Sequence, residues 1–373
     1  MMQARMTKLQ TLMGEYELGG IALNPGPTMT YLTGLHFHLM ERPTVLVITA
    51  SGKMALVLPE LEAGKLVEMP IKIEAFTYSD DPETRPEAFS RAAAYVHLAG
   101  DDVGVEATRM RFLELTYLGD AFPELGFIDA SACLAQLRMM KDADELEKMR
   151  QAARIAQVAL LETLKGVRVG MTEKELANQL IIQLLSAGSD PDLPFSPIVS
   201  FGENTANPHS MPTDRALRPG DLLLVDWGAS CEGYLSDITR TFTFGDVDPE
   251  LLKISALVLR ANAAGRAAGR PEVEAGAVDR AARAVIVEAG YGDAFIHRTG
   301  HGLGLEAHEE PYMFDGNPRV LSPGMTYTIE PGIYLPGKGG VRIEDDVVIT
   351  ETGSDSLTDL AREVLPLEDF MEV

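Results

Sequence analysis

Cysteine, tryptophan and long apolar runs are scarce in this chain of 373 residues, which contains two cysteines and one tryptophan. Two cysteines cannot form the disulfide framework on which small secreted domains depend. No apolar stretch reaches the roughly 18 residues that a membrane-spanning helix needs. Residues 1–20 have the pattern of an amphipathic helix with mixed charge, unlike a secretory signal. We therefore expect a cytoplasmic protein without a membrane-bound segment.

Positive charge is also in short supply. Lysine and arginine number 32 against 56 aspartate and glutamate residues, which gives a formal net charge of −24. A protein with this large negative net charge repels polyanions, so we expect neither nucleic acid nor an anionic membrane among the partners.

The length and the 46% hydrophobic content predict two domains with substantial cores. An α/β pattern comes first, with a helix near 3–16 and strands near 20–25, 44–50 and 53–59. A long helical pattern follows from residue 142. We place the boundary at Leu137, which gives domains of residues 1–137 and 138–373. Thr172 and Glu175 form a capping-box pattern that predicts the start of another helix.

Two aspartates flank a predicted hairpin in LLLVDWGASCEGYLSDITRTF. An apolar run leads into Asp226, a glycine-containing turn follows, and Asp237 precedes a β-branched run. This pattern predicts one acid near the turn-proximal end of each strand.

A histidine and two glutamates stand in similarly specific surroundings. His301 lies in RTGHGLGLEAHEEP, where Gly300, Gly302 and Gly304 permit close approach of the backbone. Glu330 follows MTYTI and is stopped by proline, and Glu344 lies in the strand-like GVRIEDDVVIT.

These five residues predict a two-metal site. Two divalent cations carry four positive charges, and the four carboxylates balance them, whereas the same acids without metal would repel one another. Oxygen-rich ligation with one imidazole favours Mn²⁺, with Co²⁺ or Zn²⁺ as alternatives, and neither cysteine is placed to serve as a ligand. Such an ion pair activates water for hydrolysis.

At these motifs the chain resembles the pita-bread metallopeptidases, the group of prolidase, aminopeptidase P, methionine aminopeptidase and creatinase. The resemblance spans nearly the whole chain. It also rests on SFGENTANPHSMPTDRALRPGD and LSPGMTYTIEPGIY. It implies an α+β fold, in which a C-terminal pita-bread catalytic domain follows a smaller α/β creatinase-type domain that caps the site and mediates oligomerisation. The family's metal-ligand positions fall on Asp226, Asp237, His301, Glu330 and Glu344.

The resemblance further implies hydrolysis of the bond before proline in di- or oligopeptides. It assigns His209, His297 and His308 to the substrate side, Glu330 to proton transfer as well as ligation, and Arg342 to the support of metal-bound carboxylates or of the substrate. Within the family, the long upstream domain disfavours methionine aminopeptidase, and the intact ligand set disfavours creatinase or a non-catalytic binding module.

Two activities stay open, an Xaa-Pro dipeptidase (prolidase) and an aminopeptidase P that acts on longer peptides. Some dipeptide-restricted members hold the substrate carboxylate with an arginine where this chain has Tyr312. Arg298, Arg319 or Arg342 could supply that charge, because a guanidinium grips a carboxylate with two hydrogen bonds. The compact chain favours the dipeptidase.

The loop GLHFHLMERPT places Phe37, Leu39 and Met40 between two predicted strands. Clustered exposed apolar groups can mark an interface. We expect a homodimer contact there.

Overall fold

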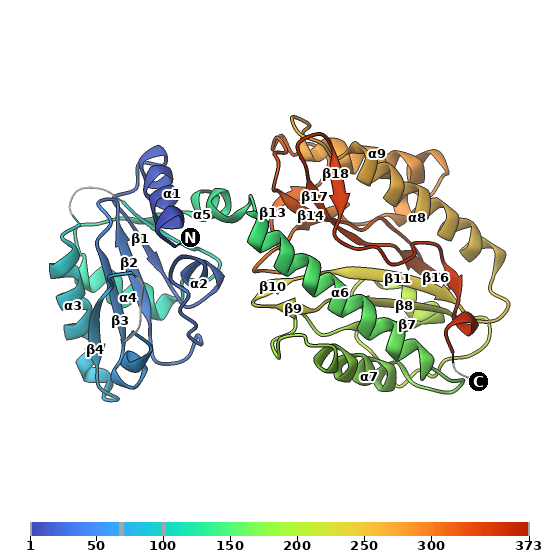
Figure 1. Ribbon diagram of the computed structural model, residues 1–373, viewed down its shortest axis with the longest axis horizontal. Coiled ribbons are helices and arrows are strands. Elements are labelled where there is room, and N and C mark those ends of the chain that lie inside the picture. The colour runs from blue at the N-terminus through green and yellow to red at the C-terminus, as the bar shows by residue number, and fades with distance from the viewer. Residues whose placement is uncertain (1, 67–70, 99–101, 372–373) are drawn as a thin grey trace. The chain divides into compact units, whose positions relative to one another are not determined.

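The computed structural model describes residues 2–66, 71–98 and 102–371. The chain divides into two compact units, Met1–Arg138 and Met139–Val373 (Figure 1). Among the described residues, no helix combines the length and the apolar character that a bilayer span requires.

The N-terminal unit is built on a six-stranded mixed sheet with the order β4-β3-β2-β1-β5-β6. Its strands are β1 (Gly20–Leu23), β2 (Val45–Thr49), β3 (Met54–Pro59), β4 (Glu74–Tyr78), β5 (Val103–Val105) and β6 (Phe127–Asp129). Its helices are α1 (Met2–Glu15), α2 (Pro27–Thr33), α3 (Arg85–Val96), α4 (Phe112–Ala121) and α5 (Ser131–Arg138), with 3-10 turns η1 (Glu60–Leu66) and η2 (Pro82–Thr84). Strands β1, β2 and β3 are buried throughout because helices cover the sheet on both sides (Figure 1).

The C-terminal unit contains two larger sheets, with the orders β19-β11-β8-β7 and β13-β12-β14-β17-β18. The strands of the first are β7 (Ile198–Phe201), β8 (Leu222–Trp227), β11 (Ile238–Thr243) and β19 (Leu365–Pro366). Those of the second are β12 (Gly300–Gly302), β13 (Glu309–Met313), β14 (Thr326–Ile329), β17 (Asp345–Ile349) and β18 (Ser354–Ser356). Two short ladders pair β9 (Ser230–Cys231) with β10 (Tyr234–Leu235), and β15 (Gly332–Leu335) with β16 (Gly339–Arg342).

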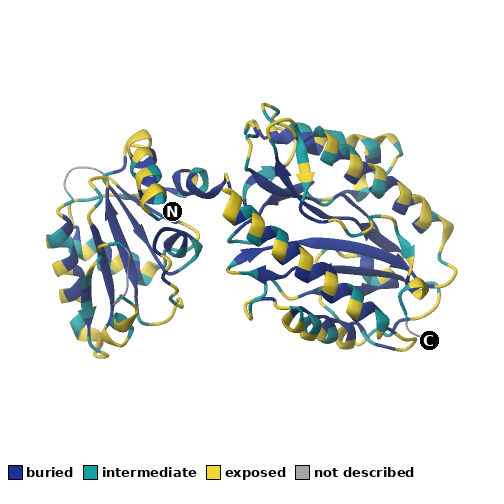
Figure 2. Ribbon diagram, in the orientation of Figure 1, coloured by how far each residue is buried: buried dark blue, intermediate teal, exposed yellow. Residues whose placement is uncertain are grey.

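Four long helices cover these sheets. They are α6 (Ala143–Lys165), α7 (Glu173–Ser186), α8 (Pro249–Ala268) and α9 (Ala275–Glu288), and the 3-10 turns are η3 (Gly202–Ala206), η4 (Gly292–Ala294) and η5 (Leu367–Asp369). Helices α6 and α7 pack on β7, β8 and β11, and α8 and α9 pack beside β15 and β16. Figure 2 shows the central strands buried, the edge strand β18 partly exposed, and the helices striped with exposed positions. The predicted capping box of Thr172 and Glu175 is confirmed at the start of α7.

The chain changes sheets twice in the second half of this unit. Strand β14 pairs with β17, whereas the following β15 pairs with β16, so one change falls after Ile329 and the other between Arg342 and Asp345. The segment predicted to be strand-like around Glu344 consists of two short strands, with Glu344 between them. Its segment leaves one ladder before joining the next, and an isolated bridge pairs Glu344 with Thr239 of β11.

Candidate metal centre

Asp226 and Asp237 come from one hairpin. Asp226 lies in β8 and Asp237 directly precedes β11, and the antiparallel register sets Thr239 opposite Asp226. The short β9–β10 ladder closes the turn between them. Both aspartates are buried. The predicted hairpin is confirmed, and it places both carboxylates at the same end of a rigid strand pair.

His301 reaches the site because the strands around it approach very closely. An added Cβ at Gly300 would lie 1.9 Å from the carbonyl oxygen of Thr328, and one at Gly302 would lie 2.3 Å from that of Glu310. No larger residue fits at either position. The prediction that glycines permit this approach is confirmed.

The structure brings all five predicted ligands together. Three groups of side chains have potential ligand atoms within 4.8 Å of one another: Asp226, Asp237 and Glu344; His301, Glu330 and Glu344; and Asp237, His301 and His308. The Nε2 atom of His301 lies 3.4 Å from a carboxylate oxygen of Glu330 and 3.7 Å from one of Asp237. Segments more than 100 residues apart in the sequence thus supply one cluster.

Burial and mutual repulsion change the proton affinity of these groups. Burial, followed by the charges of Glu344 and Asp226, raises the pKa of Asp237 well above its ordinary value. Burial, followed by the charge of Glu330, does the same to the pKa of Glu344. Burial raises the pKa of Glu330 to about 7. In His301 burial lowers the pKa, which leaves the imidazole neutral and able to ligate.

This cluster fits divalent cations. The Oδ1 atom of Asp226 is buried without a hydrogen-bond partner among the described residues, and a buried carboxylate oxygen left this way is costly unless a cation or proton meets it. Four acids that repel one another in the absence of a counter-charge point to the same conclusion. The donor set of carboxylates and one imidazole suits Mn²⁺, Co²⁺ or Zn²⁺.

A buried network fixes the carboxylates from behind. Arg342 donates from Nη2 to Asp226 over 2.6 Å and from Nε to the hydroxyl of Thr239 over 3.0 Å. That hydroxyl donates to Glu344 over 2.6 Å. Arg342 therefore holds one carboxylate directly and orients another through Thr239.

Both ring nitrogens of His297 have hydrogen-bond partners in another part of this network. Arg342 donates from Nη1 to the hydroxyl of Tyr334, which lies 2.9 Å from Nε2 of His297, and Nδ1 of His297 lies 2.7 Å from the carbonyl oxygen of Arg298. Burial, together with the charge of Arg342, lowers the pKa of His297 to about 4. A neutral imidazole held at both nitrogens anchors the backbone of Arg298.

His209 and His308 lie at the open side of the cluster, and both are exposed. The ring of His308 is centred 3.9 Å from that of His301. The loop that carries His209 is tied to the site, because Arg342 also donates to the carbonyl of the preceding Pro208 over 3.4 Å. Burial, then the charges of Arg298 and His209, lowers the pKa of His308.

The three candidate arginines differ in their partners. Arg342 is paired with Asp226, and Arg319 lies 3.5 Å from Glu310. Arg298 stacks on Tyr312, with the guanidinium carbon 4.3 Å from the ring centre, and no described carboxylate lies within ion-pair distance of it. Arg298 is therefore the one candidate whose guanidinium is available to an anion.

Sequence reasoning did not find several residues of this site. The hydroxyl of Tyr334 links Arg342 to His297, and the carboxylate of Asp346 accepts from the backbone N–H of Asp237 over 3.1 Å. Thr239 bridges Arg342 and Glu344. Except for the contact of Tyr334 with Arg342 in the same hairpin, these contacts join residues distant in the chain, so no local motif reports them.

Comparison with known proteins follows the two units. Residues 147–351 match the model of metallopeptidase family M24, and residues 5–140 match that of the creatinase/prolidase N-terminal domain. The probable dipeptidase PepE of Mycobacterium tuberculosis is 37% identical over 355 residues, which cover 93% of this chain and 92% of that protein.

Two solved structures resemble the chain over nearly its full length. The dipeptidase from Pyrococcus horikoshii is 40% identical with a TM-score of 0.90, and covers 97% of this chain and 99% of its own. The prolidase from Thermococcus sibiricus is 35% identical with a TM-score of 0.93, and covers 98% and 99% respectively. The expected α+β architecture, a creatinase-type N-terminal domain before a pita-bread domain, is confirmed.

Proposed function

The chain belongs to metallopeptidase family M24, and from this premise we propose that it is an Xaa-Pro dipeptidase, a prolidase that releases proline from Xaa-Pro dipeptides. The observation that carries the proposal is the convergence of three buried carboxylates, the partly buried Glu330 and one neutral imidazole beside an arginine that has no carboxylate partner among the described residues. The alternative is an aminopeptidase P that cleaves the same bond in longer peptides.

Asp226, Asp237, His301, Glu330 and Glu344 would hold two divalent ions, with Mn²⁺ favoured and Co²⁺ or Zn²⁺ as alternatives. Such ions supply Lewis acidity and activate water at neutral pH. Glu330 suits a second role in proton transfer, because a carboxyl with a pKa of about 7 accepts and releases a proton near neutrality.

His308 and His209 are placed to hydrogen-bond the scissile peptide from the open side of the cluster. Positioned donors of this kind each contribute on the order of 10²–10³ in rate. Arg342 orients Asp226, and its charge opposes the rise in the pKa of Asp226 that burial causes. We assign His297 to the substrate side through Arg298, whose carbonyl it holds, and so to positioning.

Arg298 supports a dipeptide over a longer substrate. A dipeptide presents its terminal carboxylate one residue beyond the scissile bond, where a cation next to the histidines can meet it. Arg298 lies near enough for its charge to act on His308, His301 and Glu330, and it lacks a carboxylate partner among the described residues. Tyr312 stacks on the guanidinium of Arg298 and holds it in position. The arginine that some dipeptide-restricted members have at the position of Tyr312 would thus be replaced by Arg298.

The test compares hydrolysis of Leu-Pro with that of Leu-Pro-Pro by chelated protein reconstituted with Mn²⁺, Co²⁺ or Zn²⁺. We expect preference for the dipeptide, and Arg298→Met should raise KM for Leu-Pro at least about tenfold by removing a charge-assisted bond. Arg319→Met is the matched control, because Arg319 already pairs with Glu310. Preference for the tripeptide would establish the aminopeptidase P. If neither peptide were cleaved with any of the three metals, a binding module would be favoured.

We also propose that the chain forms a homodimer through the loop with Phe37, Leu39 and Met40, and acts in the cytoplasm. Leu39 and Met40 are exposed apolar side chains, and both cysteines are free. Phe37→Asp with Leu39→Asp should convert a dimer to a monomer by solution mass. An unchanged mass would refute the contact.

A further inference from the structure

The two glutamates of the proposed metal centre lie where the backbone leaves a sheet ladder. Glu330 follows the end of β14, and Glu344 lies between β16 and β17. A ladder normally satisfies backbone carbonyls on both sides of a residue, and a buried carbonyl without a donor is costly. Ile329 is paired with Asp345 at the end of the β14–β17 ladder, whereas Ile343 lies outside both ladders, so a donor from another element is required to link the two carbonyls.

A single side chain supplies that donor to both. The amide nitrogen of Asn262, in α8, lies 3.1 Å from the carbonyl oxygen of Ile329 and 3.2 Å from that of Ile343. It also lies 3.0 Å from a carboxylate oxygen of Asp345. Asn262 is 0% exposed, so water cannot replace it.

With these contacts, two peptide units have hydrogen bonds at both their carbonyl and their N–H group. The carbonyl of Ile329 belongs to the same peptide unit as the N–H of Glu330, which donates to the carbonyl of Thr299 over 2.8 Å. The carbonyl of Ile343 shares a unit with the N–H of Glu344, which donates to the carbonyl of Thr239 over 3.1 Å. With Asn262 at the other end, both planar units are held at oxygen and at nitrogen.

Arg266 fixes which way the Asn262 amide faces. Its Nε donates to Oδ1 of Asn262 over 2.8 Å. Because a guanidinium can only donate, the oxygen of Asn262 faces Arg266 and the nitrogen faces the two carbonyls. The pair lies one helical turn apart on α8, so the arrangement is local to one rigid element.

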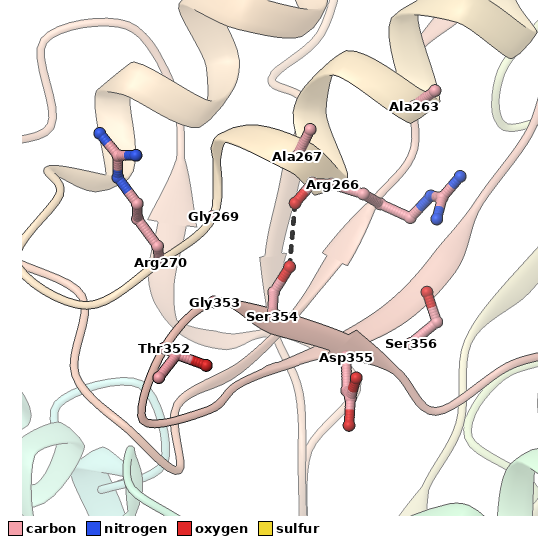
Figure 3. Close-up of a pocket in the computed structure, with 10 residues that line it drawn as sticks. All are labelled: Ala263, Arg266, Ala267, Gly269, Arg270, Thr352, Gly353, Ser354, Asp355 and Ser356. Carbon is pink, nitrogen blue, oxygen red and sulfur yellow. Dashed lines mark hydrogen bonds between the residues drawn. The ribbon is translucent and has the colours of Figure 1, made fainter.

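Arg266 also lines a pocket of about 550 Å³ between the end of α8 and the β17–β18 turn. Figure 3 shows the side chains of Arg266 and Arg270 extending to opposite sides, and the hydroxyl of Ser354 donating to the carbonyl of Arg266 over 2.9 Å. The two cations do not converge on one anion. The pocket therefore does not indicate an anion site, and the side-chain contact of Arg266 that bears on the metal centre is its hydrogen bond to Asn262.

We propose that Asn262 is a positioning residue for the metal centre, which sets the backbone of Glu330 and Glu344 through the carbonyl that precedes each. The proposal rests on the metal site of the proposed function. Partners that orient ligands in this way typically contribute 10–100-fold in metal affinity. Asn262 thus ties two ligands from different strand crossings to one helix.

The experiment titrates metal-stripped protein with Co²⁺ by calorimetry and by visible absorption of the bound ion. Asn262→Leu, similar in size but unable to donate, should weaken Co²⁺ binding about 10–100-fold and shift the absorption bands, which report ligand geometry. Asn262→Ser, too short to reach both carbonyls, repeats the test if the leucine variant does not fold.

Val258→Ala is the matched control, because Val258 is fully buried in the same helix and makes no contact with either carbonyl through hydrogen bonds. It should lower the Tm yet leave Co²⁺ affinity and spectrum unchanged. Wild-type binding and spectra in both Asn262 variants, or an equal affinity loss in Val258→Ala at the same Tm, would overturn the proposal. Wild-type protein that binds no Co²⁺ would refute the metal site itself, whereas binding without dipeptide cleavage would refute only the substrate.

Discussion

The two halves of the C-terminal unit supply the metal centre in different ways. The first half presents Asp226 and Asp237 on one hairpin, where a continuous ladder of β8 and β11 fixes their spacing. The second half presents Glu330 and Glu344 where strands change sheets, and the side chain of Asn262 donates to the carbonyl that precedes each of them. Backbone pairing sets the spacing of the ligands that share a hairpin, and Arg342 then orients the Asp226 carboxylate. Ligands at strand crossings need a dedicated buried donor.

The first way to break this comparison is to remove one ligand from each half. Asp237→Asn and Glu344→Gln should each lower kcat/KM by on the order of 10³ or more, because a metal's Lewis acidity is worth several kcal/mol. Both residues join the same group of potential ligand atoms. Metal content by mass spectrometry should fall in both. A variant of either half that kept full metal content and activity would contradict the shared centre.

The second way concerns the two histidines outside the proposed ligand set, one from each half. His308→Ala should lower kcat by on the order of 10²–10³, as for loss of a positioned donor, with metal content retained. His209→Ala should cost less, because His308 packs against His301 while His209 is held only through its loop. Steady-state kinetics with metal analysis separates these outcomes. An equal loss of metal in His308→Ala would refute its role.

The third way uses protons in place of metal. Because the pKa of Glu330 in the folded chain is about 7 and above its ordinary value, its stabilising proton is fully present below the ordinary pKa and is lost as pH rises through 7. Metal-free protein should therefore lose on the order of 3 kcal/mol between about pH 5 and about pH 8, from roughly 1.4 kcal/mol per pKa unit.

Urea denaturation of chelated protein across this range measures the effect. Glu330→Gln should make the curve less steep by about this amount, since an amide does not titrate, and the raised pKa values of Asp237 and Glu344 account for the pH dependence that is left. Metal-loaded protein should be flat, because the ion replaces the proton. If the metal-free wild type and Glu330→Gln fell alike with pH, the other buried carboxylates, Asp237 and Glu344, and not Glu330 would be the source.

Much of the fold and of the site could be predicted from local sequence. The capping box at Thr172, the hairpin between Asp226 and Asp237, and the glycines around His301 each depend on neighbours within a few residues, so the motif and the structure report the same constraint. The interruption of the strand-like segment at Glu344 could not be predicted, for the opposite reason. Where a strand changes its partner is decided by the other strand.

The sequence by itself was enough to identify the five candidate metal ligands and the family to which the chain belongs. Both depend on local motifs, because composition, turns and caps act over short distances. Only the tertiary structure decided how those side chains are held. Tyr334, Thr239 and Asn262 act on residues 37 to 105 positions away. A hydrogen bond depends on separation in space, and burial makes such bonds obligatory without leaving a mark in the local pattern.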